Sequence, residues 1–521
     1  MVHQSDVLVI GSGIAGCVCA LDLADAGIGV MLVTRAALPE ESNTLYAQGG
    51  IVYQGVGDSP DLLRDDILRA GAGSCNPRAV DILVHEGPAL VRRMLVDRVQ
   101  VPFDRTSDDD ISIVREGGHS LDRIAHVADA TGQAIERSLV DALRRHPKIT
   151  WLLGHTAIDL LTPAHHDRNR RSVYDPLSCV GAYVLDQSTG TVVRCLAGAV
   201  VLATGGIGQV YLRTTNPAGA RGDGLAMAHR AGARVINCEF VQFHPTAFYQ
   251  PHGPCFLISE AVRGAGARLV HADGQPFMQR YEPEWKDLAP RDVVARSIHR
   301  EMLDRGVPNV FLDVRSHLAP DQIRERFPTL VQGCTASGLD CTRDLIPVVP
   351  AAHYFCGGVW VDEWSATTVR NLYAVGEVSC TGLHGANRLA STSLLEGLVW
   401  GARAARRIRE TLPSVPRPLP EGIPDWVETG TEAPDPALIS QDFSQIKHIM
   451  WNYVGLSRSS HRLQRALREL RNLQHESERF YQAVRLSDEL IGLRNAVRSS
   501  LLVAEAAWEN KTSVGCHYRE S

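Results

Sequence analysis

The sequence predicts an α/β protein with a Rossmann-like dinucleotide-binding domain, an inserted α+β domain and a C-terminal three-helix bundle. The chain opens with a strand–glycine turn–helix–strand pattern, and two later strand-like runs also end in glycine turns. Between those two runs lies a long stretch with fewer strand signals, and after a proline-rich segment the apolar residues change to helical spacing. At 521 residues the chain is too long for one compact core, so several domains are expected.

A βαβ unit is expected at the start of the chain. Residues 6–10 (DVLVI) read as a buried strand, a helix follows from Cys17 to Asp25 and ends at Gly27, and residues 29–33 (GVMLV) form the next strand. The turn between strand and helix, Gly11-Ser12-Gly13-Ile14-Ala15-Gly16, matches GxGxxG. Its glycines permit a tight turn, close approach of a pyrophosphate and close helix–strand packing. The free N–H groups of the helix then attract the phosphates, so a dinucleotide site is predicted.

Other runs favour FAD over NAD as the dinucleotide. An NAD site usually has Asp or Glu after the second strand to hold a ribose hydroxyl, whereas this chain has Thr34-Arg35. Residues 199–206 (AVVLATGG) form a strand that ends in glycines, as flavoproteins often show near the dinucleotide. Residues 371–377 (NLYAVGE) resemble the late flavoprotein motif, whose acidic residue reaches the ribityl chain. The expected fold is therefore α/β, with a Rossmann-like FAD-binding domain, an inserted α+β capping domain and a C-terminal three-helix bundle.

The domain boundaries follow from these signals. The FAD-binding domain is expected in two parts, residues 1–237 and 355–411, around a capping domain at 238–354 that hinges over the flavin. Because proline disrupts helices and sheets, residues 412–436 are predicted to be a linker. Residues 437–521 form the helical domain, with helices predicted at 443–454, 460–483 and 486–509.

Composition excludes several classes of protein. The formal charge of −6 argues against a nucleic-acid partner, and no apolar stretch reaches the ~18 residues of a membrane span. The first residues lack the basic and apolar segments of a signal peptide. Twelve scattered cysteines without a CxxC pair are expected to be free thiols in a reducing cytosol, so the predicted location is cytoplasmic. No metal site is predicted.

Long motifs resemble the flavoproteins of the succinate dehydrogenase and fumarate reductase superfamily. They cover nearly the whole chain and are 44–50 (TLYAQGG), 115–120 (REGGHS), 242–246 (QFHPT), 289–292 (APRD), 349–354 (VPAAHY) and 384–389 (HGANRL). Within the superfamily the pattern is most similar to the L-aspartate oxidases. Asn43 stands where the respiratory enzymes carry a histidine bonded to FAD, so the resemblance implies non-covalent FAD. Glu116 and a short tail ending in His517-Tyr518-Arg519 also resemble the pattern of the L-aspartate oxidases.

The chain departs from this family pattern in two places. Glu41-Ser42-Asn43 replaces the usual entry to the flavin loop, and Ser259 replaces an expected threonine that also carries a hydroxyl. The resemblance implies FAD contacts from residues along the whole first domain and its second part. These are Gly11, Ser12, Gly13, Ile14, Ala15, Gly16, Arg35, Asn43, Thr44, Ala47, Gln48, Gly49, Gly50, Ala157, Asp223, Glu377, Ser393 and Leu394.

The resemblance also implies a set of substrate-binding and catalytic residues. A C4 dicarboxylate brings two negative charges into a closed site, where unpaired burial is costly. Arg388 can bind a carboxylate through two parallel N–H bonds, and His244, His353 and Ser259 can add donors. Arg291 is placed at the reacting carbons. Since the pKa of arginine exceeds ~12, it needs a proton relay, for which Glu260 and Arg263 are the candidates.

Glu116 is the residue expected to select an amino acid. An α-ammonium group needs an anionic partner, whereas succinate carries no such group. The alternative, that Glu116 is an exposed glutamate of a loop, stays open.

The function implied by the resemblance is FAD-dependent oxidation of L-aspartate to iminoaspartate, with O₂ or fumarate as electron acceptor. This is the first step of NAD synthesis by the quinolinate branch and implies a functional link to quinolinate synthase. One alternative is a soluble fumarate reductase or succinate-oxidising flavoprotein. Another is a flavin-bearing electron-transfer subunit whose helical tail docks a partner through an exposed apolar patch.

Overall fold

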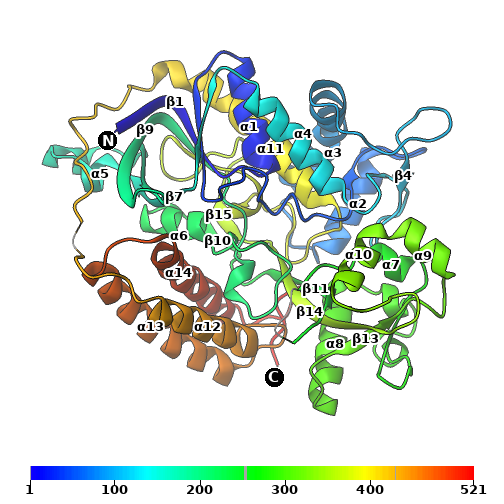
Figure 1. Cartoon of the computed structure of the whole chain (residues 1–521). Coiled ribbons are helices and arrows are strands. Elements are labelled where there is room, and N and C mark those ends of the chain that lie inside the picture. Colours follow the sequence, from blue (N-terminus) through cyan, green and yellow to red (C-terminus); the bar gives the residue numbers. More distant parts are fainter. Residues whose placement is uncertain (1, 252–254, 429, 521) are drawn as a thin grey trace.

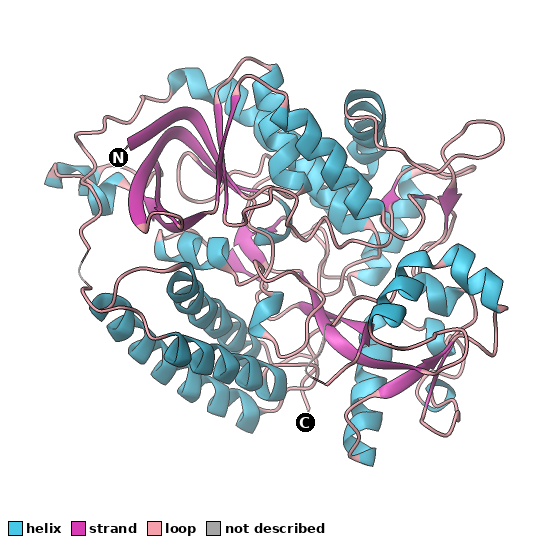
Figure 2. Ribbon diagram, viewed as in Figure 1, coloured by secondary structure: helices cyan, strands magenta, loops and turns pink. Residues whose placement is uncertain are grey.

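The computed structural model describes residues 2–251, 255–428 and 430–520. Figure 1 shows three regions: a large sheet with helices at the top, the C-terminal helices in orange and red at the lower left, and the green capping region at the lower right. Figure 2 shows the same view with the main sheet and the capping sheet in magenta, on either side of a central region of loops. The first region contains both predicted parts of the FAD-binding domain.

The main sheet has seven strands in the order β6-β2-β1-β9-β8-β7, and β16 also pairs with β9. Strands β6, β2, β1, β9 and β16 run parallel, and β7 and β8 add an antiparallel extension. The bounds are β1 Val2–Ile10, β2 Val30–Thr34, β6 Ile149–Leu153, β7 His155–Leu161, β8 Gly181–Asp186, β9 Thr191–Leu202 and β16 Leu372–Ala374. The predicted strand–helix–strand unit is thus present, with its helix starting inside the glycine turn.

Alternate side chains of β1 face two different cores. Val7 and Val9 pack with the helices α1 (Ile14–Asp25), α4 (Thr131–Arg144) and α11 (Thr392–Thr411). Leu8 and Ile10 belong to a second core that also contains buried residues of the C-terminal helices. A parallel sheet must be covered on both faces, which explains its continuous apolar strands. The C-terminal bundle therefore shares the core beneath the second face, together with α6 (Asp223–Arg230).

Shorter elements complete the FAD-binding domain. Helix α3 (Pro77–Leu90) continues as a π-helix over Val91–Arg98. Two small sheets have the orders β3-β5-β4 and β10-β15-β17. The remaining bounds are α2 Pro60–Ala70, α5 Pro163–His166, β3 Ile51–Val52, β4 Ile113–Val114, β5 Ile124–Ala125, β10 Val235–Ile236, β15 Gly358–Trp360 and β17 Ser379–Cys380.

The capping domain is built on an antiparallel sheet with the order β11-β14-β13-β12. Strands β11 (Val241–Phe248) and β14 (Ile346–Phe355) form a ribbon that joins it to the FAD-binding domain. The expected boundaries at 238 and 354 fall at one end of this ribbon, whereas the capping core itself starts at Phe248 and ends at Val349. The other elements are β12 Arg268–Val270, β13 Val310–Asp313, α7 Glu260–Gly264, α8 Arg291–Arg305, α9 Pro320–Arg326 and α10 Pro328–Ala336.

The C-terminal helices are α12 (Pro436–Tyr453), α13 (Ser460–Ala483) and α14 (Asp488–Glu509). Helix α12 begins at Pro436, earlier than the predicted residue 443. Asp435 accepts a hydrogen bond from the Ala437 N–H, and proline is well suited to the first helical position. In the described part of the chain, no helix is both long and apolar enough to cross a bilayer.

After α14 the chain runs back between the bundle and the capping domain. The Cys516 N–H donates to the Ala386 carbonyl at 2.9 Å, and the buried Arg458 donates to His517 Nδ1 at 2.7 Å. Arg296 of α8 donates to the Gly515 carbonyl at 3.2 Å. The tail thus contacts the bundle, the capping domain and the segment that carries Arg388.

Candidate active site

An elongated pocket runs along the carboxyl ends of β1, β2 and β9, the edge at which α/β folds bind dinucleotides. Fourteen of the predicted FAD contacts line it, from Arg35, Ala157 and Asp223 at one end to Glu377, Ser393 and Leu394 at the other. The others on the pocket wall are Gly11, Ser12, Gly13, Ile14, Ala15, Asn43, Thr44 and Ala47. Because the end of the second strand receives the adenosine ribose in this fold, we call the Arg35 end the adenosine end.

The glycine turn leaves no room for a side chain. Gly11 has φ +113°, and a Cβ there would lie 2.1 Å from the Ala203 carbonyl oxygen. A Cβ on Gly16 would lie 2.2 Å from the Gly11 carbonyl oxygen, so Gly16 serves the contact between α1 and β1 and does not line the pocket. Both clashes are with backbone, so the local fold depends on glycine at these positions.

Two polar atoms on the pocket wall fit the presence of FAD. Asn43 Oδ1 and Thr204 Oγ1 are buried and have no hydrogen-bond partner within the described residues. Asn43 Nδ2 donates to Glu377 Oε2 at 2.5 Å, and the Phe355 N–H donates to Glu377 Oε1 at 2.9 Å. Burial raises the pKa of Glu377 to about 7. Hydroxyl and amide groups of a bound dinucleotide would supply the missing partners.

Gln48, Gly49 and Gly50 do not line this pocket. A Cβ on Gly49 would lie 2.5 Å from Glu116 Oε1, and one on Gly50 would meet the backbone of β5. This part of the predicted FAD set therefore lies toward Glu116, on the side of the predicted substrate residues.

Two bulges in the β11–β14 ribbon position the predicted histidines. The pairing skips His353 on β14, between Gln242↔Tyr354 and Phe243↔Ala352, and β11 has an extra residue directly after His244. Bulges redirect side chains next to active sites. Here the two imidazole rings meet edge to face, with centroids 5.2 Å apart.

Both histidines are held neutral by their surroundings. Burial, followed by the charge of Arg291, keeps the pKa of His244 well below its usual value. Burial and the charge of Arg388 do the same for the pKa of His353. His244 Nδ1 lies 3.2 Å from both the N–H and the carbonyl oxygen of Thr246, so the backbone of Thr246 holds the ring through this nitrogen. His353 Nδ1 contacts Thr215 Oγ1 at 2.9 Å.

Arg388 is buried and stacks on an aromatic ring. Its guanidinium carbon lies 4.6 Å from the centre of the Tyr354 ring, and Nη1 donates to Ser393 Oγ at 3.4 Å. The Tyr354 hydroxyl donates to Glu396 Oε2 at 2.9 Å, which fixes the ring. Burial, followed by the charge of Arg291, lowers the pKa of Arg388. The geometry favours a nearby anion.

Arg291 and Glu260 form the expected pair. Arg291 Nε donates to Glu260 Oε2 at 2.7 Å, and Arg263 lies 4.0 Å from the same oxygen, too far for a hydrogen bond. Although burial opposes it, the charges of Arg291 and Arg263 hold the pKa of Glu260 below its usual value. Ser259 caps α7 by accepting from the Ala261 N–H at 3.3 Å, which leaves its own O–H free to donate.

Glu116 lies beside the same group. The Ser391 hydroxyl donates to Glu116 Oε2, and a Cβ on Gly117 would lie 1.9 Å from Glu260 Oε1. The loop is anchored by His119, whose Nε2 donates to the Ala390 carbonyl at 3.0 Å while Nδ1 accepts from Arg123 at 3.2 Å. Glu116 is therefore part of the site wall and is not an exposed loop residue.

Several buried guanidinium donors remain unused in this arrangement. Arg291 Nη1, Arg388 Nε, and both Nε and Nη2 of Arg263 have no hydrogen-bond partner within the described residues. Arg291 and Arg388 are close enough to each other to perturb the pKa of the same histidine, His353. Unsatisfied buried guanidinium donors are costly, so this region, next to the part of the pocket lined by His353 and Tyr354, is suited to an anionic ligand.

Sequence reasoning missed the residues that support this set. Thr215 contacts His353, and Asn216 Nδ2 donates to the His353 carbonyl at 3.0 Å. His384 and Thr381 complete the hydrogen bonds of Glu396 below Tyr354. The polar run 214–216 (TTN) was the available signal, but nothing in the sequence indicates that it lies beside β14.

Comparisons with known proteins agree with this geometry. A family model described as "FAD binding domain" matches residues 6–394, and one described as "Fumarate reductase flavoprotein C-term" matches residues 444–521. L-aspartate oxidase 1 of Ralstonia nicotianae is 46% identical over 98% of this chain and 94% of its own length. The L-aspartate oxidase of Halobacterium salinarum is 44% identical over 99% and 96%.

Solved structures give the same result. A variant of the E. coli quinol fumarate reductase flavoprotein superimposes with a TM-score of 0.89 at 29% identity, covering 100% of this chain and 92% of its own. Sdh1 of Mycobacterium smegmatis gives 0.82 at 30% identity, with 99% and 89% covered. The cofactor of the pocket is FAD. This chain belongs to the L-aspartate oxidase family, within the superfamily of succinate dehydrogenase and fumarate reductase flavoproteins.

Proposed function

We propose that the protein oxidises L-aspartate to iminoaspartate, with O₂ or fumarate as the final electron acceptor. The observation that supports this most is the combination of unpartnered donors on Arg291 and Arg388 with the nearby carboxylate of Glu116. The arginine donors suit a dicarboxylate, and the carboxylate of Glu116 suits an α-ammonium group.

The proposal assigns two residues of the site to each substrate carboxylate. Arg388 and His353 hold one substrate carboxylate, while His244 and Ser259 donate to the other. In this arrangement His244 carries its proton on Nε2 and donates from there, while Nδ1 accepts from the Thr246 N–H. Both histidines are neutral, so each donates one N–H without adding charge, and the arginines supply the positive field.

Bound FAD supplies the acceptor for the hydride that leaves Cα. The chain's own residues must orient Cα and take the proton that leaves the amino nitrogen. We assign Arg291 to the reacting carbons; it hydrogen-bonds to Glu260, whose carboxylate can hold that proton. Glu260 is the only group in direct hydrogen-bond contact with Arg291 among the described residues, so we assign the relay to this pair.

The remaining parts of the proposal concern the cell. We place the enzyme in the cytoplasm at the first step of NAD synthesis, where its unstable imine product passes to quinolinate synthase. Asn43 replaces the flavin-linking histidine, so FAD is held without a covalent bond. The soluble fumarate reductase remains the second candidate, and Glu116 argues against it because succinate has no group that needs this carboxylate.

The test is aerobic turnover of the purified protein with L-aspartate and succinate in parallel, measured as peroxide formation. We expect peroxide from L-aspartate and none from succinate. Turnover of succinate alone would reject the proposal and place the chain with the succinate-oxidising flavoproteins.

A further inference from the structure

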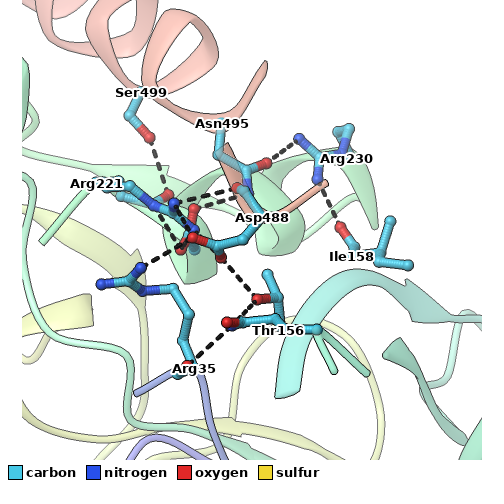
Figure 3. A network of polar contacts seen from close by, with 11 residues as sticks. Arg35, Thr156, Ile158, Arg221, Arg230, Asp488, Asn495 and Ser499 are labelled. Carbon is cyan, nitrogen blue, oxygen red and sulfur yellow. Dashed lines mark hydrogen bonds and ion pairs between the residues drawn. The ribbon is translucent and has the colours of Figure 1, made fainter. Parts of the chain in front are cut away.

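The C-terminal bundle reaches the adenosine end of the FAD pocket through the start of α14. Arg35 follows β2, at the position where an acidic residue was missing from the fingerprint, and its Nη1 donates to Asp488 Oδ2 at 2.9 Å. The two residues are 453 positions apart in the chain. Figure 3 shows Asp488 at the centre of a network that joins α14 to the pocket wall.

Asp488 uses both carboxylate oxygens in contacts within the protein. Besides Arg35, it accepts from Arg221 Nη1 and Nη2, each at 3.0 Å, and from the Thr156 hydroxyl at 2.7 Å. Arg35 and Thr156 line the pocket, whereas Asp488 does not. Any effect of Asp488 on a bound ligand is therefore exerted through these neighbours.

Three further α14 residues hold the turn that precedes α6. Asn495 Nδ2 donates to Asp223 Oδ1 at 2.8 Å, and the Ser499 hydroxyl donates to the Gly222 carbonyl at 3.0 Å. Gly492 packs against Arg221 so closely that a Cβ would lie 2.4 Å from Nη1. Positions 488, 492, 495 and 499 repeat at helical spacing and form one face of α14.

Arg221 links the two halves of this contact. It donates from Nη2 to Asp223 Oδ2 at 3.0 Å as well as to Asp488, and only 5% of its surface is exposed. Although burial opposes it, the charges of Arg221 and then Arg35 hold the pKa of Asp488 below its usual value. A buried ion cluster contributes little net stability compared with apolar packing. Precise placement of the pocket wall is therefore the better explanation for these charges.

We propose that this face of α14, formed by Asp488, Gly492, Asn495 and Ser499, positions the FAD site by fixing Arg35, Thr156 and the 221–223 turn at its adenosine end. Asp223 and Arg35 line the pocket but are each oriented by a residue of the C-terminal bundle. The bundle thereby sets the affinity for a cofactor that no covalent bond retains. This inference rests on the FAD pocket alone and is independent of the identity of the substrate.

The test compares Asp488→Asn with Glu489→Gln. Both substitutions remove one negative charge from the first turn of α14, but Glu489 is exposed and makes no polar contact among the described residues. Apoprotein is titrated with FAD, and flavin fluorescence reports binding. We expect Asp488→Asn to raise the FAD dissociation constant about tenfold relative to Glu489→Gln, since charged hydrogen bonds that hold the wall are lost. Asp488→Glu, which keeps the charge, should recover part of the affinity.

ADP as a competitor locates the effect. If the α14 face acts on the adenosine end, Asp488→Asn weakens ADP binding by the same factor as FAD binding. Equal FAD affinity for Asp488→Asn and Glu489→Gln, or weaker FAD binding with unchanged ADP binding, would overturn the inference.

Gly492→Ala covers the case in which Asp488→Asn does not fold. The added methyl meets the buried guanidinium of Arg221 and no backbone atom, so Arg221 and the turn shift while alanine suits the helix. We expect weaker FAD and ADP binding, with any lowering of the unfolding midpoint of the apoprotein removed by saturating FAD. A lower midpoint without loss of ADP affinity would show a structural role only and would reject the proposal.

Discussion

Glu116 illustrates how one side chain can select a substrate. It sits between Gly49 and Ser391, and its loop also contacts Glu260 through Gly117. No glutamate is required there to bind a second carboxylate, and a negative charge would repel one. Its position beside unpartnered arginine donors is explained by a ligand that carries both charges.

We predict that Glu116→Gln separates two activities of the site. Aspartate oxidation should fall about 30-fold or more in kcat/KM, because a half-buried partner of the ammonium group loses its charge. Fumarate reduction by the reduced enzyme should be largely kept, since fumarate has no ammonium group. Both rates can be measured on one preparation.

A neighbouring substitution provides the control for this experiment. Arg115→Gln removes a charge from the same loop, but Arg115 is half exposed and pairs with Asp122 at 2.8 Å. It should leave both activities unchanged. An equal loss of both in Glu116→Gln would mean that this residue supports the loop and does not select the amino acid.

The sequence predicts residues that lie within short motifs better than residues that act from a distance. The glycine turn and the FAD contacts along it follow from local backbone requirements, and most of them line the pocket. Thr215 and Asp488 carry no such signal, because their roles arise only when distant segments meet. The absence of an acidic residue after β2 was visible, but the carboxylate that pairs with Arg35 comes from α14.

At the scale of elements, the first turn of α8 joins the capping domain to the rest of the site. Arg291 and Asp292 open this helix, and Asp292 lies 3.5 Å from Asn387, the residue before Arg388. Arg296, one turn later, donates to Asp292 at 2.8 Å and to the Gly515 carbonyl of the tail. The helix is thus held to both sides of the substrate site.

We predict that Arg296→Ala loosens this end of α8. Loss of these contacts should speed hydrogen exchange of the amides at 291–296 about tenfold and raise KM for the dicarboxylate, because Arg291 is held less firmly. Hydrogen exchange followed by mass spectrometry, together with steady-state kinetics, measures both effects.

Arg300→Ala is the matched control for Arg296. Arg300 lies one turn further along α8, is 65% exposed and pairs only with Asp304 in the described contacts. It should change neither exchange nor KM. If both variants behave alike, the contacts of Arg296 with the tail have no role in holding the helix.

The sequence predicts the bounds of a helix or strand best where the apolar residues within it are regularly spaced. The first βαβ unit and the helices α13 and α14 match their predictions closely, since their apolar spacing is regular. The start of α12 was predicted too late because its first residues, 436–438, are exposed and follow the proline-rich segment, so only the Asp-Pro cap marked it. The bulges beside His244 and His353 depend on pairing between β11 and β14, which periodicity does not reveal.

At the scale of the whole molecule, the cores do not follow the order of domains along the chain. The C-terminal helices share one core with the second face of the main sheet, whereas the capping domain has a core of its own. The sequence predicted the bundle but could not show what its apolar faces pack against. An electron-transfer partner docked on an apolar tail surface also lacks support, since Leu438 and Tyr518 are the only large apolar side chains exposed among described residues 436–520.

We predict that the sheet and the bundle unfold together. Leu470→Ala in α13 should destabilise both by about 2–5 kcal/mol, so peptides from β9 and α13 should lose hydrogen-exchange protection equally. Leu330→Ala in the capping core should affect peptides of that domain alone. Loss of protection in α13 without any change in β9 would show two independent units.

The contact between Arg35 and Asp488 also bears on the order of events during protein synthesis. The ribosome makes the glycine turn and Arg35 almost at once, but Asp488, in the helix that holds this wall of the pocket, follows Arg35 only after 453 residues. A nascent chain therefore displays a phosphate-binding turn long before it has a finished site. We expect FAD to be acquired late, by a nearly complete chain, so that flavin supply limits the active fraction of the enzyme and not the amount that is made.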